Sequence, residues 1–310
     1  MNSVIIRKEK QEGNEKIIVE KEVELKDNGK KLVLPTVPNM DVIIGLDKCE
    51  DLEELRIIMG RIPKIKGLDI LVNLKKLYLN NQSLTELKGL ETLTNLEVLR
   101  LEQNDLKSTK GLEKLTNLKE LILNFNKIED LADLEHLANL ETLDLKKNNI
   151  KEIKGLDNLS NLEVLNLSQN KIKEIKGLDG LKNLKELWLV NNEISELKGL
   201  ENLENLEKLY LVKNDIEEIK GLEGLTNLKE LSLNENKIKE LQGLDNLQSL
   251  TRLRLDKNLI SDVKGLENLK NLEKLNLGKN NLSEKLIKDL GGIDWKGWVK
   301  APQKFVEHSQ

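Results

Sequence analysis

Leucine and isoleucine recur along most of the chain at a fixed spacing. Residues 93–114, LTNLEVLRLEQNDLKSTKGLEK, and residues 159–180, LSNLEVLNLSQNKIKEIKGLDG, place their apolar residues at the same positions. The pattern returns every 22 residues without a slip and gives eleven units. Each unit opens on a framework leucine: Leu52, Leu74, Leu96, Leu118, Leu140, Leu162, Leu184, Leu206, Leu228, Leu250 and Leu272. A strict internal repeat of this length predicts a solenoid in which each unit packs only on its neighbours.

The start of each unit, LxxLxLxxN, predicts one short β-strand. Residues two apart share a face of a strand, so the leucines point inward and the strands stack as a parallel sheet. The asparagine ends the strand, where its side-chain amide can bond backbone groups and form a ladder along the stack. The predicted ladder is Asn104, Asn126, Asn148, Asn170, Asn192, Asn214, Asn236, Asn258 and Asn280. Gly60 and Gln82 depart from this pattern, so we expect the first two turns to be looser.

The second half of each unit predicts a tight outer turn. Its glycine, before the recurrent GL, suits a close-packed turn, and Asp133 replaces that glycine once, where the turn should differ. Strands stack about 4.8 Å apart while full helices need about 10 Å, so short outer segments favour turns or 3₁₀ pieces. We therefore expect an α/β repeat solenoid, a shallow arc with an eleven-strand parallel sheet on its concave face and short segments on the convex side.

The N-terminal segment predicts a β cap. Residues 1–40 alternate polar and apolar positions and contain Asn28-Gly29, a strong hairpin signal, so they are interpreted as a β-hairpin cap that extends the sheet. A half-unit follows and opens the repeat region, residues 41–282. Cys49 falls on a framework position and is interpreted as a buried small apolar residue.

The C-terminal segment, residues 283–310, predicts a helical cap. Ser283 suits the start of a first helix and Pro302 that of a second. We expect Trp295, Trp298 and Phe305 to cover the last repeat.

Composition and motifs limit the chemistry. A formal net charge of −4 argues against a nucleic-acid binder that works by bulk charge. The start lacks the apolar core of a signal peptide and no stretch is long enough to span a membrane, so a soluble, cytoplasmic monomer is expected. The chain has two histidines, one cysteine and none of the common nucleotide, metal or nucleophile motifs. We expect no enzymatic activity, no catalytic residue, no metal and no cofactor.

The repeat residues resemble those of leucine-rich repeat proteins, whose units are 20–29 residues long. The variant NxIxxIxGLxxLxNL is most similar to the 22-residue class typified by the leucine-rich regulatory subunit of protein phosphatase 1. That resemblance implies a phosphatase catalytic subunit as a partner on the concave face. Bacterial internalins share the repeat length but usually carry Ser-Pro where this chain has Lys-Gly.

Aromatic residues fall outside the leucine framework. The outward position between the framework leucines carries one residue per repeat, among them Tyr78, Arg100, Ile122, Trp188, Tyr210 and Arg254. The next outward position carries Val190 and Val212, and Phe125 lies beside Asn126 where the chain turns. Aromatic residues and arginine are enriched at binding hot spots. These nine residues are the predicted partner-binding set. All except Arg254 fall into two groups, one of Tyr78, Arg100, Ile122 and Phe125 and one of Trp188, Val190, Tyr210 and Val212. The groups should lie roughly 15–30 Å apart, within reach of one partner of standard interface size.

Three functional hypotheses remain open at this point. The first is a protein-interaction module that holds a folded protein on its concave face, with Trp188 and Tyr210 as anchors. The second is a structural or engineered repeat scaffold without a dedicated partner, for which the unbroken period speaks. The third is a secreted, internalin-like adhesin.

Overall fold

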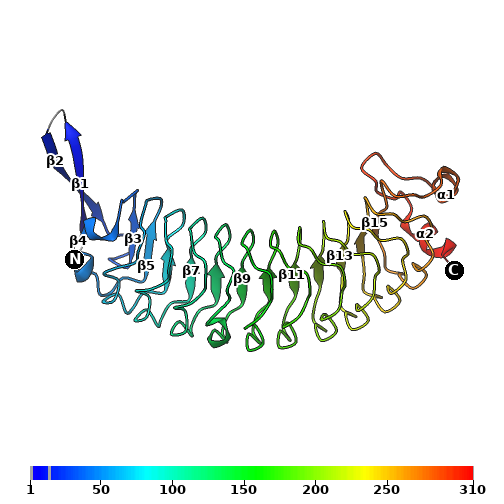
Figure 1. Cartoon of the computed structure of the whole chain (residues 1–310), viewed down its shortest axis with the longest axis horizontal. Coiled ribbons are helices and arrows are strands. Elements are labelled where there is room, and N and C mark those ends of the chain that lie inside the picture. The colour runs from blue at the N-terminus through cyan, green and yellow to red at the C-terminus, as the bar shows by residue number, and fades with distance from the viewer. Residues whose placement is uncertain (1–2, 13–14, 310) are drawn as a thin grey trace. The chain divides into compact units, whose positions relative to one another are not determined.

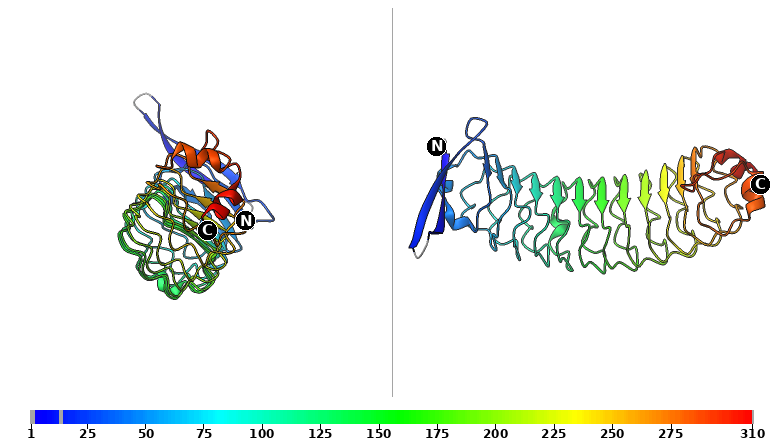
Figure 2. Two further views of the ribbon diagram at one scale, coloured as in Figure 1. Left: turned by 90° about the vertical axis from the view of Figure 1, so that its right-hand side faces the viewer. Right: turned by 90° about the horizontal axis from the view of Figure 1, so that it is seen from above.

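The computed structural model describes residues 3–12 and 15–309 and divides into two compact units, Met1–Asn148 and Asn149–Gln310. Each unit is a parallel-sheet solenoid, and the strands of each follow one another in a single row (Figures 1 and 2). The eleven repeats supply one strand each, as predicted, and the strands pair parallel within each unit.

The repeat strands of the first unit are β5 to β9, preceded by β3. Their bounds are β3 Lys31–Leu34, β5 Glu54–Ile57, β6 Lys76–Tyr78, β7 Val98–Arg100, β8 Glu120–Ile122 and β9 Thr142–Asp144. β3 pairs parallel with β5 and so extends the sheet by one strand beyond the repeats. Among the described residues of this unit, the chain forms 3₁₀ helices η1 Met40–Val42, η2 Leu46–Lys48 and η3 Leu134–His136.

The second unit holds β10 to β15 and two short helices. The bounds are β10 Val164–Asn166, β11 Glu186–Trp188, β12 Lys208–Tyr210, β13 Glu230–Ser232, β14 Arg252–Arg254, β15 Lys274–Asn276, α1 Glu284–Asp289 and α2 Pro302–His308. In the described part of the chain, α1 and α2 are the only α-helices, so turns carry the outer side of the repeats.

The framework leucines form the core. Leu55, Leu77 and Leu187, for example, have no exposed surface, and the same holds for most framework positions. Burial of a leucine side chain stabilises the fold by about 1.5–3 kcal/mol, so the stacked leucines are the main source of stability. Cys49 lies in this core, as predicted, and burial raises the pKa of its thiol.

The predicted asparagine ladder binds backbone groups of its own turn and also joins neighbouring repeats. The Nδ2 of Asn126 donates to the carbonyl of Leu101 in the preceding repeat at 3.0 Å and to Leu123 in its own repeat at 2.9 Å. Its Oδ1 accepts the backbone N–H of Leu106 at 3.1 Å. One buried amide therefore satisfies three backbone groups that would otherwise lack partners.

The two positions that depart from the ladder, Gly60 and Gln82, lie next to each other in the structure. The longer side chain of Gln82 still donates to the carbonyls of Ile57 and Asn80, but its buried Oε1 has no hydrogen-bond partner among the described residues. A Cβ on Gly60 would lie only 2.5 Å from that oxygen and 2.3 Å from the carbonyl oxygen of Val37. The glycine thus leaves room for the longer glutamine side chain. The Gln82 Oε1 accepts no hydrogen bond among the described residues, whereas the Oδ1 of a ladder asparagine such as Asn126 accepts a backbone N–H.

The outer turns need their glycines for two reasons. Gly199 has a φ of +89°, and a Cβ there would lie 2.1 Å from the carbonyl oxygen of Ile175 in the preceding repeat. Asp133 adopts the same left-handed conformation with a φ of 65°, and its Oδ2 accepts the backbone N–H of Gly111 at 2.9 Å. The outer segment after Asp133 forms η3, so this turn does differ locally, as expected.

The N-terminal segment differs in part from the sequence prediction. Its long hairpin pairs β1, Ser3–Glu12, with β2, Glu15–Glu24, and β1 also pairs with β4, Ile43–Ile44, in a separate three-stranded antiparallel sheet. The Asn28-Gly29 pair makes a turn closed by the Lys26–Lys31 bridge, which leads the chain into β3. The turn signal was therefore real, but it does not join the two strands of the long hairpin.

The C-terminal segment covers the last repeat with fewer aromatic residues than predicted. The Ser283 Oγ accepts the Leu286 N–H at the start of α1, Pro302 begins α2, and Phe305 is fully buried. The prediction that Trp295 covers the last repeat is wrong, because this side chain is 89% exposed. Backbone pairing of residues 297–299 with β15 closes the sheet edge instead.

We predict that Asn126→Ala lowers the free energy of unfolding by about 2–4 kcal/mol, because it leaves two carbonyls and one N–H buried without partners. Chemical denaturation monitored by circular dichroism measures the loss. Asn117→Ala is the matched control, since Asn117 makes one exposed hydrogen bond, to the Thr94 carbonyl. Equal losses in the two variants would contradict a special role for the buried ladder.

Candidate functional site

The strand face is the surface formed by the side chains that point away from the core on β5 to β15. On β11 the framework residue Leu187 is fully buried, while Glu186 and Trp188 on either side of it are only partly buried. Tyr78, Arg100, Ile122, Tyr210 and Arg254 occupy the same position on their own strands and are likewise partly buried. The structure therefore keeps these residues out of the core, as the repeat frame requires.

Trp188 and Tyr210 form one stacked pair on the strand face of the second unit. They lie opposite each other in the parallel register of β11 and β12. Their ring centroids are 3.8 Å apart and the ring planes differ by 21°. Val190 and Val212 follow two residues later on the same chain segments, and both are partly buried. Such a pair is worth about 0.5–1.5 kcal/mol beyond its area, so cross-strand packing accounts for part of its presence.

A carboxylate fixes the tyrosine of this pair. The Tyr210 hydroxyl donates to Oε2 of Glu230 on β13 at 3.1 Å. Burial of the phenol, helped by the Glu230 charge, raises the pKa of Tyr210 to about 12, because both disfavour the phenolate. Glu230 also pairs with Arg252 at 3.2 Å. The aromatic pair is thus preorganised by a short hydrogen-bonded network.

Tyr78 is held by arginines in the first unit. The guanidinium of Arg56 lies 4.0 Å from the ring centroid and that of Arg100 lies 5.8 Å away. Arg100 is in turn bound to Oε1 of Glu120 at 2.6 Å. These cation–π contacts order the ring and the guanidinium groups. Arg56, Glu120 and Glu230 also contribute to these contacts but were not in the predicted binding set.

Ile122 and Phe125 extend this group unequally. Ile122 lies next to Arg100 in the register of β7 and β8. Phe125 comes after the end of β8, is 39% exposed, and has the Lys147 Nζ 4.6 Å from its ring centroid. Its backbone is left-handed, with a φ of 58°. Nine other repeats carry Asn, Gln, Lys or Glu at this position in the same left-handed conformation, so Phe125 is the bulky residue among them.

Arg254 joins a different set of residues. Its guanidinium lies 5.8 Å from the ring centroid of Trp298, which belongs to the C-terminal segment. Its Nε is 3.6 Å from Oδ1 of Asp256, too long for a hydrogen bond. The structure shows no contact of Arg254 with Trp188 or Tyr210 within the described part of the chain. Trp298, assigned to the cap from sequence, contributes to the strand face.

Two half-buried carboxyl groups belong to the first unit, Glu102 after the end of β7 and Asp144 at the end of β9. Burial raises the pKa of Glu102 and, on β9, that of Asp144. The Asn124 Nδ2 donates to Oδ2 of Asp144 at 3.2 Å. The strand face of this unit is therefore mixed in charge, with its arginines paired to glutamates and two further acids half-buried.

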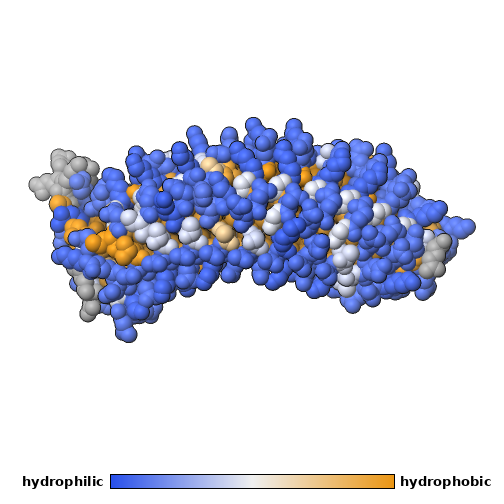
Figure 3. Space-filling view, turned by 90° about the horizontal axis from the view of Figure 1, so that it is seen from below, coloured by the Kyte–Doolittle hydropathy of each residue, from blue (hydrophilic) through white to orange (hydrophobic). Residues whose placement is uncertain are grey.

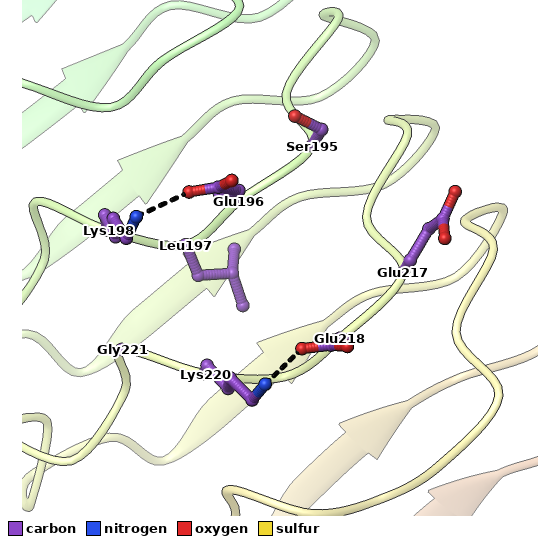
Figure 4. Close-up of a pocket in the computed structure, with 8 residues that line it drawn as sticks. All are labelled: Ser195, Glu196, Leu197, Lys198, Glu217, Glu218, Lys220 and Gly221. Carbon is purple, nitrogen blue, oxygen red and sulfur yellow. Dashed lines mark hydrogen bonds and ion pairs between the residues drawn. The ribbon is translucent and has the colours of Figure 1, made fainter.

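One groove of the second unit lies away from these residues. It has a volume of about 650 Å³ and lies beside Ser195, Leu197 and Gly221 (Figure 4). Four of its charged side chains form two ion pairs, Glu196 with Lys198 at 3.0 Å and Glu218 with Lys220. No histidine lies beside Ser195 among the residues that line this groove.

One group of potential metal ligands occurs among the described residues, at η3. Ligand atoms of Asp133, Glu135 and His136 lie within 4.8 Å of one another. The Asp133 carboxylate already accepts the Gly111 N–H and holds the outer turn. The turn accounts for this cluster, and exposed acidic groups commonly gather without a metal.

The surface is mostly polar. Figure 3 shows hydrophilic side chains over most of one side, with a hydrophobic area near the N-terminal end. The exposed large apolar residues of the first unit include Ile44, Ile58, Met59, Ile70 and Val72. Among the described residues, no helix has the length and apolar character that crossing a bilayer requires.

We predict that Phe125→Asn stabilises the fold by up to about 1 kcal/mol, because asparagine adopts the left-handed conformation more readily than phenylalanine. Thermal or chemical denaturation measures the change. Gln169→Asn, at the same position of another repeat, is the control and should change stability little. A destabilised Phe125→Asn variant would show that the ring contributes packing that outweighs the backbone cost.

We predict that Tyr210 ionises near pH 12 rather than near 10, and that Glu230→Gln lowers its pKa. Spectrophotometric titration in a Tyr78→Phe background follows Tyr210 alone, since the chain has two tyrosines. Because the folded pKa lies above the unfolded one, stability is lost as the pH rises from about 10 to about 12. A normal phenol titration in the folded chain would contradict the buried, carboxylate-bound geometry.

Comparison with known proteins supports the assignment of the fold. The family described as Leucine Rich repeats (2 copies) matches residues 94–136, 138–180, 160–202, 182–221, 204–246 and 248–292. No curated protein matches the chain.

Solved structures of several repeat proteins are similar. An internalin (inlF) from Listeria monocytogenes is 28% identical with a TM-score of 0.68, over 82% of each chain. The Leptospira interrogans LRR protein LIC12759 is 33% identical with a TM-score of 0.69, over 77% of this chain and 63% of that one. TLR13 in its complex with ssRNA13 is 28% identical with a TM-score of 0.70, over 80% of this chain and 39% of that one. The matched repeats, the framework leucines and the parallel strands together place this chain in the leucine-rich repeat family.

Proposed function

We propose that this protein is a non-enzymatic interaction module that binds a folded protein on its strand face, with Trp188 and Tyr210 as the anchors. Leucine-rich repeats are commonly protein–protein interaction modules. The observation that carries the proposal is the stacked Trp188–Tyr210 pair outside the leucine core. Aromatic residues of this kind dominate the binding energy of many interfaces.

The core does not require this pair. The framework leucines on both sides of Trp188, Leu187 and Leu189, are fully buried, whereas both rings of the pair lie outside the leucine core. The pair is also ordered before any partner arrives, since the rings stack and Glu230 holds the tyrosine hydroxyl. Ordered side chains lose little conformational entropy on binding, which favours their use as anchors.

The first unit offers a second anchor group for the same role. Tyr78, Arg100 and Ile122 lie on successive strands, and Arg100 is fixed by Glu120. Phe125 occupies a backbone conformation that disfavours a bulky side chain, so the fold gives no reason for its presence. Val190, Val212 and Arg254 complete the proposed partner-binding set in the second unit.

A more specific version of this proposal is that the protein is a phosphatase-regulatory subunit, whose partner would be a phosphatase catalytic subunit. Only the repeat sequence supports this version. An internalin-like adhesin is the second candidate, favoured by the similarity to the Listeria internalin. Cell fractionation of the native host separates the two, because the first requires protein inside the cell and the second requires it outside.

We predict that a Trp188→Ala, Tyr210→Ala double variant keeps its fold, at a cost of about 1–2 kcal/mol for the lost stacking, and loses its partner. Affinity purification with mass spectrometry from native extracts identifies what the parent chain retains, and circular dichroism checks the fold. Binding of the purified partner should weaken at least about tenfold.

The control is an Ile70→Ala, Val72→Ala double variant, which removes two exposed apolar side chains from the outer segment between β5 and β6. It should retain the partner at the parent level. Unchanged binding by the Trp188, Tyr210 variant would overturn the proposal, as would equal losses in both variants.

A further inference from the structure

Trp295 is the most exposed of the large hydrophobic residues that the structure describes. It is 89% exposed, while Phe305 in the same C-terminal segment is fully buried. Its one described ring contact is with the Lys296 Nζ, 4.8 Å from the ring centroid. Exposed tryptophan costs solubility and brings this fold no burial, so its position calls for another account.

A rigid turn presents this side chain. The Asp294 Oδ1 accepts the N–H groups of Lys296 at 2.9 Å and of Trp298 at 2.8 Å. The Asp294 carbonyl accepts the Gly297 N–H at 2.9 Å, and the Asp294 N–H donates to the Trp298 carbonyl at 2.8 Å. Four hydrogen bonds close a turn of five residues, so the backbone that carries the indole is fixed.

Hydrogen bonds attach this turn to the end of β15. The Leu277 and Gly278 N–H groups donate to the Gly297 carbonyl at 3.0 and 3.2 Å. The Asn276 Nδ2 donates to the Lys296 carbonyl at 3.2 Å. A Cβ on Gly297 would lie 2.5 Å from the Asn276 Oδ1, so the approach is as close as a glycine allows. Trp295 therefore projects from the ordered end of the sheet.

The same end of the chain, residues 270–305, is basic. Residues 270–305 contain eight lysines and four acidic residues, a net charge of +4 in a chain of −4. The lysines are Lys270, Lys274, Lys279, Lys285, Lys288, Lys296, Lys300 and Lys304. None of them takes part in an ion pair with another described residue, whereas repeat lysines such as Lys119 and Lys229 bind a glutamate one repeat earlier.

We propose that Trp295, together with Lys296 and Lys300 close to it in the sequence, forms a docking site for an acidic protein segment whose apolar side chain packs on the indole. Unpaired lysines complement carboxylates, and one rigid tryptophan matches one apolar side chain rather than a bilayer, which needs a larger apolar area. A nucleic acid would require a wider basic surface than this one end of an acidic chain. The site stands whether or not the strand face binds a partner.

A random peptide library displayed on phage, selected on the full chain, tests the site. The selected peptides should be rich in Asp and Glu around one aromatic or aliphatic residue. Trp295→Ala should weaken their binding at least about tenfold, measured by fluorescence anisotropy of the labelled peptide. A Lys296→Glu, Lys300→Glu variant should weaken it further, and added salt should weaken it in the parent chain.

Three matched variants separate this site from other causes. Leu259→Ala removes another exposed apolar residue of the second unit, and a Lys110→Glu, Lys114→Glu variant makes the same charge change elsewhere. Both should bind the peptides like the parent chain. The Trp188→Ala, Tyr210→Ala variant should also bind them normally, which distinguishes this site from the strand-face anchors.

Several outcomes would overturn the proposal. These are peptides without an acidic bias, peptides that bind Trp295→Ala as tightly as the parent, and Trp295-dependent binding of anionic phospholipid vesicles or of poly(U) RNA in preference to the peptides. Preferential binding of the vesicles would assign the exposed indole to a membrane surface, and preferential binding of poly(U) would assign it to nucleic acid.

Discussion

A single repeat cannot bury its own leucines, and this constraint shapes everything else in the molecule. Each strand has three or four residues, and the leucines at its centre are shielded only when neighbouring repeats stack on both sides. Stacking brings polar backbone groups into the interior. The buried asparagines satisfy them, since each binds its own repeat and the preceding one. The leucines thus supply the burial, while the asparagines fix the spacing at which it occurs.

Because the framework leucines and asparagines stabilise the fold, the residues of the strand face can vary from repeat to repeat. Its residues change from strand to strand, from Tyr78 between arginines to the Trp188–Tyr210 stack. The positions that matter for stability and those proposed for binding alternate along the same three-residue strands. A substitution on the strand face can therefore alter recognition at a small cost in stability, which is the property that suits repeats to binding diverse partners.

The fold could be predicted almost completely from the sequence, because the same pattern of leucine, asparagine and glycine positions occurs in eleven repeats. The exceptions show where one position depends on another. Gly60 and Gln82 read as two separate departures from the ladder, yet the missing Cβ of one makes space for the longer side chain of the other. Asn28-Gly29 predicted a turn correctly, but turn chemistry alone does not say which strands the turn connects.

The sequence by itself determined the solenoid, its period, the buried leucines and the face on which each aromatic repeat residue lies, because side-chain direction follows from position in a regular strand. Only the tertiary structure decided how those side chains combine: that Trp188 stacks on Tyr210, that Glu230 holds the tyrosine, and that Arg254 meets Trp298. It also placed Trp295 in solvent. Residues 283–310 lie outside the repeat, so no periodicity fixes the direction of their side chains. In that segment, hydrogen bonds to β15 place Trp298 beside the sheet and leave Trp295 exposed to solvent.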